Sequence, residues 1–286
     1  TRFKSEKPKV MHEILGKPML WYVITNLKNG RIEDIAVVVG HKAQEVKEQF
    51  KNEGVRFFQQ KNPKGGTADA VLAAKDFFSS YDGYVLVING DTGYGRIVKE
   101  PGTDKIIKIV EEKDATPEER AIREVNGGTY IFYAPLLIEA LYNLKPSPVT
   151  GELYLTDVVS YITSKGYEVR SFMAKEPVEV LGVNTRWELS LVESIVKLKL
   201  IKYWAERGVT FHFPETIWIE PDVTLEPDVE IYPGVALKGK TKVGKGSVIG
   251  TGSVLKDAIV EQGCEVKEYC VIEDSTLRSG SVVGPF

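Results

Sequence analysis

Over residues 20–181 the hydrophobic positions follow two alternating patterns. Short apolar, β-branched runs predict strands at residues 35–40, 84–88 and 129–133. Apolar residues at three- and four-residue steps predict helices at residues 20–28, 43–50, 68–78 and 156–164. This alternation is typical of a mostly parallel sheet covered by helices. The first of these helices lacks the preceding strand that a β-α-β unit needs.

Residues 185–208 predict one amphipathic helix that ends at a glycine. Beyond residue 210 the period becomes six, and an unbroken series of aliphatic residues occupies one position of the hexad: Ile219, Leu225, Ile231, Leu237, Val243, Ile249 and Leu255. A short fixed period predicts a solenoid whose units bury their apolar faces by stacking. Mainly small residues occupy another hexad position, which we assign to tight turns: Gly234, Gly246, Gly252, Ala258, Cys264 and Cys270.

These patterns predict three regions. Residues 1–184 form an α/β domain with a Rossmann-like mixed sheet, residues 185–209 a connecting helix, and residues 210–286 part of a left-handed parallel β-helix of hexapeptide repeats. The length of 286 residues agrees, because it exceeds what one hydrophobic core usually organises. The register of the two cysteines gives them a packing role rather than redox chemistry.

Charge and composition narrow the function classes. A net charge of -3 and a pI of about 5.8 argue against nucleic acid or an anionic membrane as the main partner. No run approaches the ~20 apolar residues that cross a bilayer, and the first residues lack the apolar region of an export signal. Two cysteines are too few for a disulfide framework. We therefore expect a cytoplasmic protein.

Three short segments offer candidate chemistry. Arg2 and Lys9 place two phosphate-binding side chains on an early loop, although a solvated basic terminus has the same composition. The glycines of Gly65–Thr67 let a main chain approach a base, but such a loop is also an ordinary helix start. Asp91 follows an apolar strand, where α/β folds bind ligands, and a simple turn is the alternative.

A family resemblance selects among these alternatives. Thr1-Arg2 followed by Pro8-Lys9 is similar to the end of the signature loop of sugar-1-phosphate nucleotidyltransferases. Further segments match in order: Gly65–Ala70, Asn89–Asp91, Thr92–Ile97, Glu111–Ala115, Glu124–Gly128, Gly151–Asp157 and Glu179–Arg186. With the solenoid, the chain resembles the bifunctional bacterial N-acetylglucosamine-1-phosphate uridylyltransferases/glucosamine-1-phosphate acetyltransferases.

The resemblance implies a role for each matched residue. Arg2 and Lys9 would be catalytic, Asp91 and Asn184 would bind Mg²⁺, and Asn184 would also contact substrate. The remaining substrate contacts would come from the base loop and the sugar segments: Gln60, Gly66, Thr67, Gly95, Glu111, Asn126, Tyr154 and Thr156. The chain departs from the family pattern at Asp69, Asn89 and Gly127, and an extra residue leaves Gln59 as an alternative to Gln60.

The implied reaction is Mg²⁺-dependent transfer of UMP from UTP to N-acetylglucosamine 1-phosphate, which gives UDP-N-acetylglucosamine for cell-wall and lipopolysaccharide precursors. The resemblance also implies a homotrimer formed through the β-helix. Two alternatives remain: another sugar-1-phosphate nucleotidyltransferase, and a non-catalytic trimeric scaffold that binds sugar nucleotides.

The resemblance is incomplete in three places. The family's glycine loop before Thr1 and a segment between Asp91 and Thr92 have no counterpart here. We therefore expect that a longer natural chain is truncated at both ends and lacks an internal segment. The acetyltransferase half needs a catalytic histidine on later coils, whereas this sequence has only His12, His41 and His212. We expect no acetyltransferase activity from this polypeptide.

Overall fold

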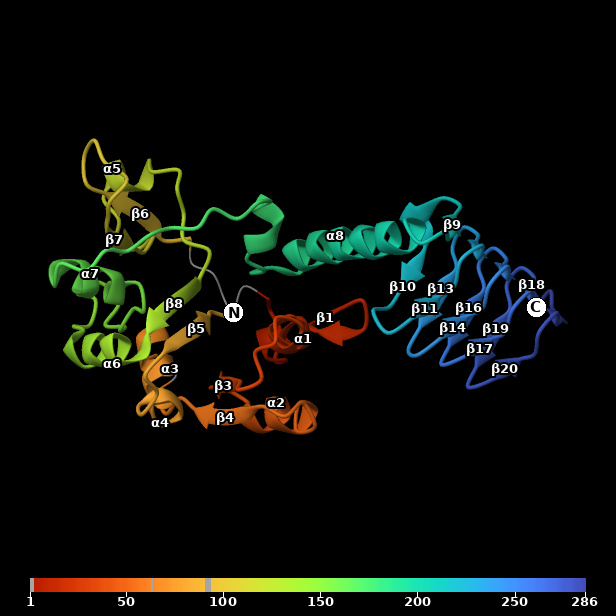
Figure 1. Ribbon diagram of the computed structural model, residues 1–286, viewed down its shortest axis with the longest axis horizontal. Coiled ribbons are helices and arrows are strands. Elements are labelled where there is room, and N and C mark those ends of the chain that lie inside the picture. The colour runs from red at the N-terminus through yellow and green to blue at the C-terminus, as the bar shows by residue number, and fades with distance from the viewer. Residues whose placement is uncertain (1–2, 63, 91–93) are drawn as a thin grey trace. The chain divides into compact units, whose positions relative to one another are not determined.

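The computed structural model describes residues 3–62, 64–90 and 94–286, except for the side chains of Pro177 and Val178. The chain divides into two compact units (Figure 1). The first consists of Thr1–Met11 and Val23–Asn184, and the second of His12–Tyr22 and Thr185–Phe286. The chain therefore passes from the first unit to the second at two points, after Met11 and after Asn184.

The first unit contains three pairs of strands among its described residues. Strand β3 (Ala36–Val39) runs parallel to β4 (Arg56–Gln59). The pairs β5 (Tyr84–Ile88) with β8 (Thr129–Tyr133), and β6 (Arg96–Lys99) with β7 (Ile106–Val110), are antiparallel. The mixed character predicted from the sequence is confirmed, but among the described residues the strands form three separate two-stranded sheets, and only one of these is parallel. The residue pattern of an apolar strand does not specify whether its neighbour runs parallel or antiparallel, so the sequence pattern could not predict the strand direction.

Several helices contact these strands (Figure 1). The helices before residue 184 are α1 (Met19–Asn29), which belongs to the second unit up to Tyr22, α2 (Ala43–Gln49), α3 (Thr67–Ala73), α4 (Lys75–Phe78), α5 (Pro117–Arg120), α6 (Ala134–Asn143) and α7 (Asp157–Ser164), with 3-10 turns η1 (Lys9–Met11) and η2 (Pro177–Val180). The single helix predicted over residues 68–78 is wrong, because a tight turn at Ala74, whose N–H donates to the Val71 carbonyl, divides it. The sequence reading missed α6, where Pro135 occupies the first turn, a position that proline tolerates.

One apolar cluster joins the elements of the first unit. Its buried members come from α3, α6, α7 and strands of the antiparallel pairs, and include Phe132, Leu137, Leu155 and Val158. Partly buried residues of β3 and β4 pack against it as well. The three strand pairs therefore share one core, and this core fixes the loops at the strand ends.

The second unit contains helix α8 (Arg186–Ala205) and a small hairpin of β1 (Glu13–Ile14) and β2 (Lys17–Pro18). Thr185 and Glu188 form a reciprocal capping box at the start of α8. The hairpin is held against α8 by a hydrogen bond from the Leu15 N–H to the Glu193 carboxylate, 2.9 Å long. An ion pair between Lys17 and Asp222 ties it to the solenoid.

The solenoid is a parallel β-helix with three stacked sheets. These are β10-β13-β16-β19, β11-β14-β17-β20 and β21-β18-β15-β12-β9, and every pairing in them is parallel. The bounds are β9 (Thr210–Phe211), η3 (Pro214–Thr216), β10 (Trp218–Ile219), β11 (Thr224–Leu225), β12 (Glu230–Ile231), β13 (Ala236–Lys238), β14 (Lys242–Val243), β15 (Val248–Ile249), β16 (Val254–Lys256), β17 (Ile259–Val260), β18 (Glu265–Val266), β19 (Val271–Glu273), β20 (Thr276–Leu277) and β21 (Val282–Val283).

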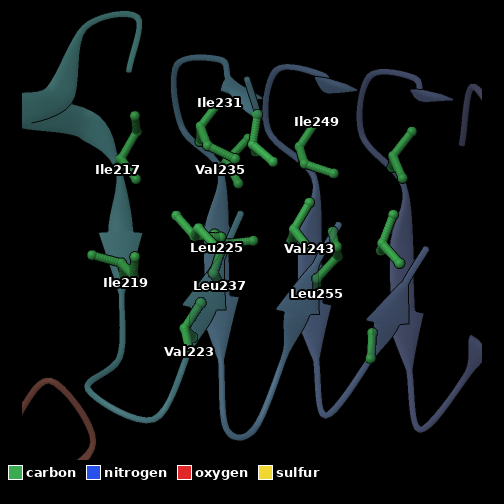
Figure 2. Packing of buried hydrophobic residues seen from close by; sticks show 14 of the residues in the cluster. Ile217, Ile219, Val223, Leu225, Ile231, Val235, Leu237, Val243, Ile249 and Leu255 are labelled. Atoms are coloured by element: carbon green, nitrogen blue, oxygen red, sulfur yellow. The ribbon is translucent and has the colours of Figure 1, made fainter. Parts of the chain in front are cut away.

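The hexad residues form the interior of this solenoid, as predicted. Figure 2 shows Leu225, Leu237, Val243 and Leu255 among the side chains that fill the space between stacked strands. All seven hexad residues from Ile219 to Leu255 are at most 6% exposed. The early coils are 18 residues long, because Ala236 pairs with Val254. Three hexads therefore make one coil.

The predicted common register of the small residues is wrong. Val254 pairs with Val271, only 17 positions away, so the later coils are one residue shorter. Gly246 and Gly252 lie in turns with positive φ, whereas Cys264 and Cys270 are buried. The main-chain N–H groups of these cysteines donate to Ser247 Oγ and Ser253 Oγ one coil earlier. The cysteines thus occupy the core position that those serines hold.

The solenoid core generates a test of stacking. Ile249→Ala should lower the free energy of unfolding of this unit by about 3 kcal/mol, since Ile249 is fully buried and truncation leaves a cavity. Ile259→Ala is the matched control, because that side chain is 44% exposed, and should cost less than about 1 kcal/mol. Urea titrations of both variants measure the difference. Equal losses would show that hexad burial does not stabilise the solenoid.

Candidate functional site

Lys9 and Asn184, 175 positions apart, meet in the first unit. Lys9 begins the short turn η1, and its Nζ donates to Asn184 Oδ1 at 2.9 Å. Asn184 directly precedes Thr185, the N-cap residue of α8. The structure therefore brings together a predicted catalytic cation and a predicted metal ligand.

The other two residues assigned to the phosphates and the metal, Arg2 and Asp91, lie outside the described residues. Gly90 does lie within them, and a Cβ placed there would be 3.5 Å from Val10 Cγ1. The end of the β5 segment is thus close to the turn that carries Lys9. The roles of Arg2 and Asp91 stay predictions.

Gln60 organises residues 65–67, which the family resemblance assigns to the base and which we call the base loop. Its Nε2 donates to the Gly66 carbonyl at 3.0 Å and to Asp69 Oδ2 at 2.9 Å. Gln59, the alternative residue, is exposed at the end of β4. The side chain of Gln60 therefore faces the glycine loop, and Asp69, one of the departures from the family pattern, helps to hold it there.

A ladder of three hydrogen bonds joins this loop to a segment almost ninety residues later. The Leu153 N–H donates to the Gly65 carbonyl, and the Ala68 N–H donates to the Leu153 carbonyl, both at 2.9 Å. The Leu155 N–H donates to Thr67 Oγ1 at 2.8 Å. Thr67 therefore fixes the loop through its hydroxyl, which already accepts a hydrogen bond.

Gly66 makes this close approach possible. Its φ of 89° and ψ of -177° belong to a region that is essentially restricted to glycine. A Cβ there would lie 2.4 Å from the Leu153 carbonyl oxygen and 2.8 Å from the Leu153 nitrogen. Both atoms are main chain and cannot rotate away, so a side chain at residue 66 would disrupt the ladder.

Gly95 and Asn126, both predicted to contact the sugar, lie side by side. The Asn126 N–H donates to the Gly95 carbonyl at 2.7 Å. The Asn126 side chain is buried, accepts from the Gly128 N–H at 3.1 Å and donates to the Tyr130 hydroxyl. Burial raises the pKa of Tyr130 to about 12, so its hydroxyl keeps its proton.

Glu111 connects this pair to the segment Gly151–Asp157. A Cβ on Gly95 would lie 3.7 Å from the Glu111 carboxyl carbon, and the Thr156 hydroxyl donates to Glu111 Oε1 at 3.0 Å. Burial is the main cause that raises the pKa of Glu111, and the charges of Asp114 and Glu152 add to it. Tyr154 lies beside Thr156 in sequence and contacts the Thr150 hydroxyl at 2.7 Å.

Two carboxyls that were not assigned from the sequence accompany Glu111. Asp157 is the first residue of α7, and its pKa is raised to about 6, chiefly by burial and then by the charges of Asp114 and Glu111. Asp114 accepts from the Ser147 hydroxyl at 3.1 Å. The quoted motifs contained both residues, but nothing in the sequence indicated that the segments would converge.

A surface depression of about 500 Å³ lies elsewhere on the first unit. Its lining includes Lys99, Lys105 and Arg170, each of which is paired with a carboxylate. It contains none of the predicted site residues. Paired, solvated charges give it no chemistry that would compete with the site above.

This chain is similar to several known proteins. Residues 4–96 match the family model of nucleotidyl transferases. The Bifunctional protein GlmU of Aquifex aeolicus (strain VF5) is 68% identical over 263 residues, which cover 78% of this chain and 57% of that protein. The Bifunctional protein GlmU of Thermodesulfovibrio yellowstonii is 36% identical over an alignment that covers 100% of this chain and 70% of that protein.

The chain belongs to the bifunctional GlmU family. It spans 57% of the length of the Aquifex aeolicus GlmU protein. The alignment with the Thermodesulfovibrio GlmU protein has 319 positions against 286 residues in this chain, so at least 33 positions have no counterpart here. This agrees with the expectation of an absent internal segment.

A solved structure is similar to this chain in fold. The nucleoside-diphosphate-sugar pyrophosphorylase from Vibrio cholerae RC9 superposes with a TM-score of 0.52 at 18% identity, over 66% of this chain and 93% of that one. Within the described residues, no helix is both long and apolar enough to cross a membrane.

Gly66, in the base loop, generates one prediction. Gly66→Ala should reduce the free energy of unfolding by at least about 2 kcal/mol, because it combines an unfavourable backbone conformation with a main-chain clash. Gly151→Ala is the control: its φ is also positive, at 74°, but a Cβ there meets nothing within 4 Å. It should cost about 1 kcal/mol. Urea unfolding compares the two variants, and equal losses would contradict the clash.

Asp157 generates a second prediction. Its folded-state pKa of about 6 exceeds the usual 3.8, so the folded state binds the proton more tightly. This contribution to stability is complete below about pH 4 and is lost as the pH rises through 6. Asp157→Asn should flatten that decline by about 1 kcal/mol, an amount reduced by solvent screening. Unfolding titrations from pH 4 to 7 measure it.

The control for the pH effect is Asp34→Asn, at a carboxyl that is 89% exposed. This variant should keep the pH dependence of the parent chain. If the free energy of unfolding falls equally with pH in the parent chain and in Asp157→Asn, then Asp157 is not the source of the pH dependence.

Proposed function

We propose that this chain transfers UMP from UTP to N-acetylglucosamine 1-phosphate and releases pyrophosphate. The observation that carries the proposal is the continuous set of contacts among the predicted residues. Gln60 contacts Gly66, Thr67 bonds to the segment of Thr156, and Thr156 bonds to Glu111. Gly95 adjoins both Glu111 and Asn126.

The chemistry of these groups supports separate binding regions for the base, the sugar and the phosphates. The glycine loop presents main-chain groups and the Gln60 amide, which suit the edge of a uracil. Glu111, Asn126 and Thr156 offer acceptors and donors that suit sugar hydroxyls and an N-acetyl group. Lys9 supplies a cation for the phosphates.

The described residues fit a magnesium ion that is held mainly by substrate. Mg²⁺ commonly takes one or two protein oxygen ligands and completes its octahedron with phosphates and water. Asn184 supplies one such oxygen, and its Oδ1 already accepts a hydrogen bond from the Lys9 cation. We propose that Asn184 and Asp91 hold Mg²⁺, which when bound would neutralise phosphate charge.

The protein groups then act by orientation and charge. Lys9 would hold the sugar phosphate or the α-phosphate, and Arg2 would stabilise charge on the triphosphate and the leaving pyrophosphate. A phosphate oxygen of the sugar would attack the α-phosphorus in line, with no covalent enzyme intermediate. Such transfers depend mainly on positioning and charge neutralisation.

Three further proposals rest on the sequence pattern and on family membership. We propose the domain limits 1–184, 185–209 and 210–286, a homotrimer assembled through the β-helix, and a cytoplasmic location. Sedimentation equilibrium of the purified chain tests the trimer, and a monomer at micromolar concentration would contradict it.

A substrate panel tests the reaction. Four nucleoside triphosphates combined with N-acetylglucosamine, glucose and mannose 1-phosphates should give pyrophosphate from UTP with N-acetylglucosamine 1-phosphate in preference to the other pairs. Preference for another pair would favour a different nucleotidyltransferase. Sugar-nucleotide binding without any pyrophosphate release would favour the non-catalytic scaffold.

Lys9→Ala and Arg2→Ala should each lower kcat by roughly two orders of magnitude, the scale of losing one electrostatic contact with the transition state. Lys28→Ala is the matched control, because it removes a surface lysine that pairs with Glu53 in the same unit. It should retain the parent kcat in a continuous pyrophosphate assay. An unchanged kcat in Lys9→Ala would exclude that residue from the proposed role.

A further inference from the structure

Residues 180–184 touch three parts of the candidate site within five positions. At one end, Val180 lies against Gly127: a Cβ on that glycine would be 2.9 Å from Val180 Cγ1. In the middle, the Gly182 N–H donates to the Tyr94 phenol oxygen at 2.5 Å. At the other end, Asn184 Oδ1 accepts from Lys9. We name residues 180–184 the strap.

Tyr94 joins the strap to the sugar side of the site. It directly precedes Gly95, whose carbonyl accepts from the Asn126 N–H. Its φ of 49° lies in the left-handed region, which is unfavourable for a bulky side chain. Such conformations persist where the surroundings hold them. Here the Tyr94 carbonyl accepts from the Arg96 guanidinium while the phenol accepts from Gly182.

We propose that Tyr94 is a positioning residue for uridylyl transfer. Its phenol oxygen holds the Gly182 N–H and thereby sets the place of Asn184 relative to Gly95. The inference deepens the proposed function and rests on it for its catalytic consequence. The mechanical part, that Tyr94 determines the position of Asn184, concerns the free chain alone.

Gly182 and Asn184 are so close in sequence that a shift of Gly182 displaces Asn184. Only Val183 separates Gly182 from Asn184, and two residues span at most ~7 Å of chain. A displaced Gly182 therefore moves Asn184 with little room for compensation. A displacement of about 1 Å at a positioning group can cost on the order of 100-fold in rate. Tyr94 would thus act on the phosphate side while its own main chain adjoins the sugar side.

Tyr94→Phe tests the mechanical part without any need for activity. This variant removes one oxygen and retains the ring. In the ¹⁵N-labelled chain, exchange of the Gly182 amide should become about tenfold faster, and the side-chain amide signal of Asn184 should shift. Tyr133→Phe is the matched control, since it removes a phenol that bonds to Asp82, and should leave both signals in place. An unmoved Asn184 signal in Tyr94→Phe would overturn the proposal.

A double-mutant cycle tests the catalytic part. Tyr94→Phe should lower kcat about tenfold, raise the Mg²⁺ concentration for half-maximal rate several-fold, and change KM for the sugar phosphate less than twofold. In the Asn184→Ala background the same change should alter kcat less than twofold, because residues that act through one another are not additive. A tenfold loss in both backgrounds would overturn the proposal.

The two readouts separate this inference from the proposed function. If the parent chain releases no pyrophosphate but the Asn184 signal responds to Tyr94→Phe, the proposed reaction fails for this chain and the positioning contact stands. If the parent chain is active and neither the Asn184 signal nor the Mg²⁺ dependence changes in Tyr94→Phe, Tyr94 has no positioning role.

Discussion

The candidate site depends on the hydrogen-bond ladder between Gly65–Ala68 and Leu153–Leu155. This ladder brings the base loop to the start of α7, and the Thr156 hydroxyl then reaches Glu111. The constraint is steric as much as polar, because only a glycine at position 66 lets the two main chains approach so closely. Without the ladder, the loop assigned to uracil would lose its direct bonds to the segment that precedes α7.

Much of the fold could be predicted because its signals are local. The hexad from Ile219 to Leu255 specifies the solenoid at every coil, and β5 and β8 match their predicted bounds. The errors arose where a neighbour in space decides the outcome. Sheet direction depends on the partner strand. The shortened coil that moves Cys264 and Cys270 into the core is visible only through the register of Val254 with Val271.

The residues of the candidate site fall into the same two groups, those indicated by local sequence and those that depend on neighbours in space. Lys9, Gln60, Glu111 and Asn184 could be named from motifs, since the resemblance supplies both residue type and order. Contacts that depend on convergence could not be named. Asp157 becomes unusual only because burial and the charges of Asp114 and Glu111 surround it, and the Tyr94 phenol meets Gly182 from 88 positions away.

Positive and negative charges lie in different parts of the candidate site. Lys9 carries a positive charge to Asn184, whereas Glu111, Asp114 and Asp157 gather partly buried carboxyls at the start of α7. Phosphate oxygens are stabilised by cations and repelled by carboxylates, while neutral sugar hydroxyls can donate to carboxylates. Under the proposed function, this charge distribution would orient a sugar phosphate with its ring toward Glu111 and its phosphate toward Lys9. The strap would maintain that orientation, because it ends at Asn184 and contacts Tyr94 and Gly127.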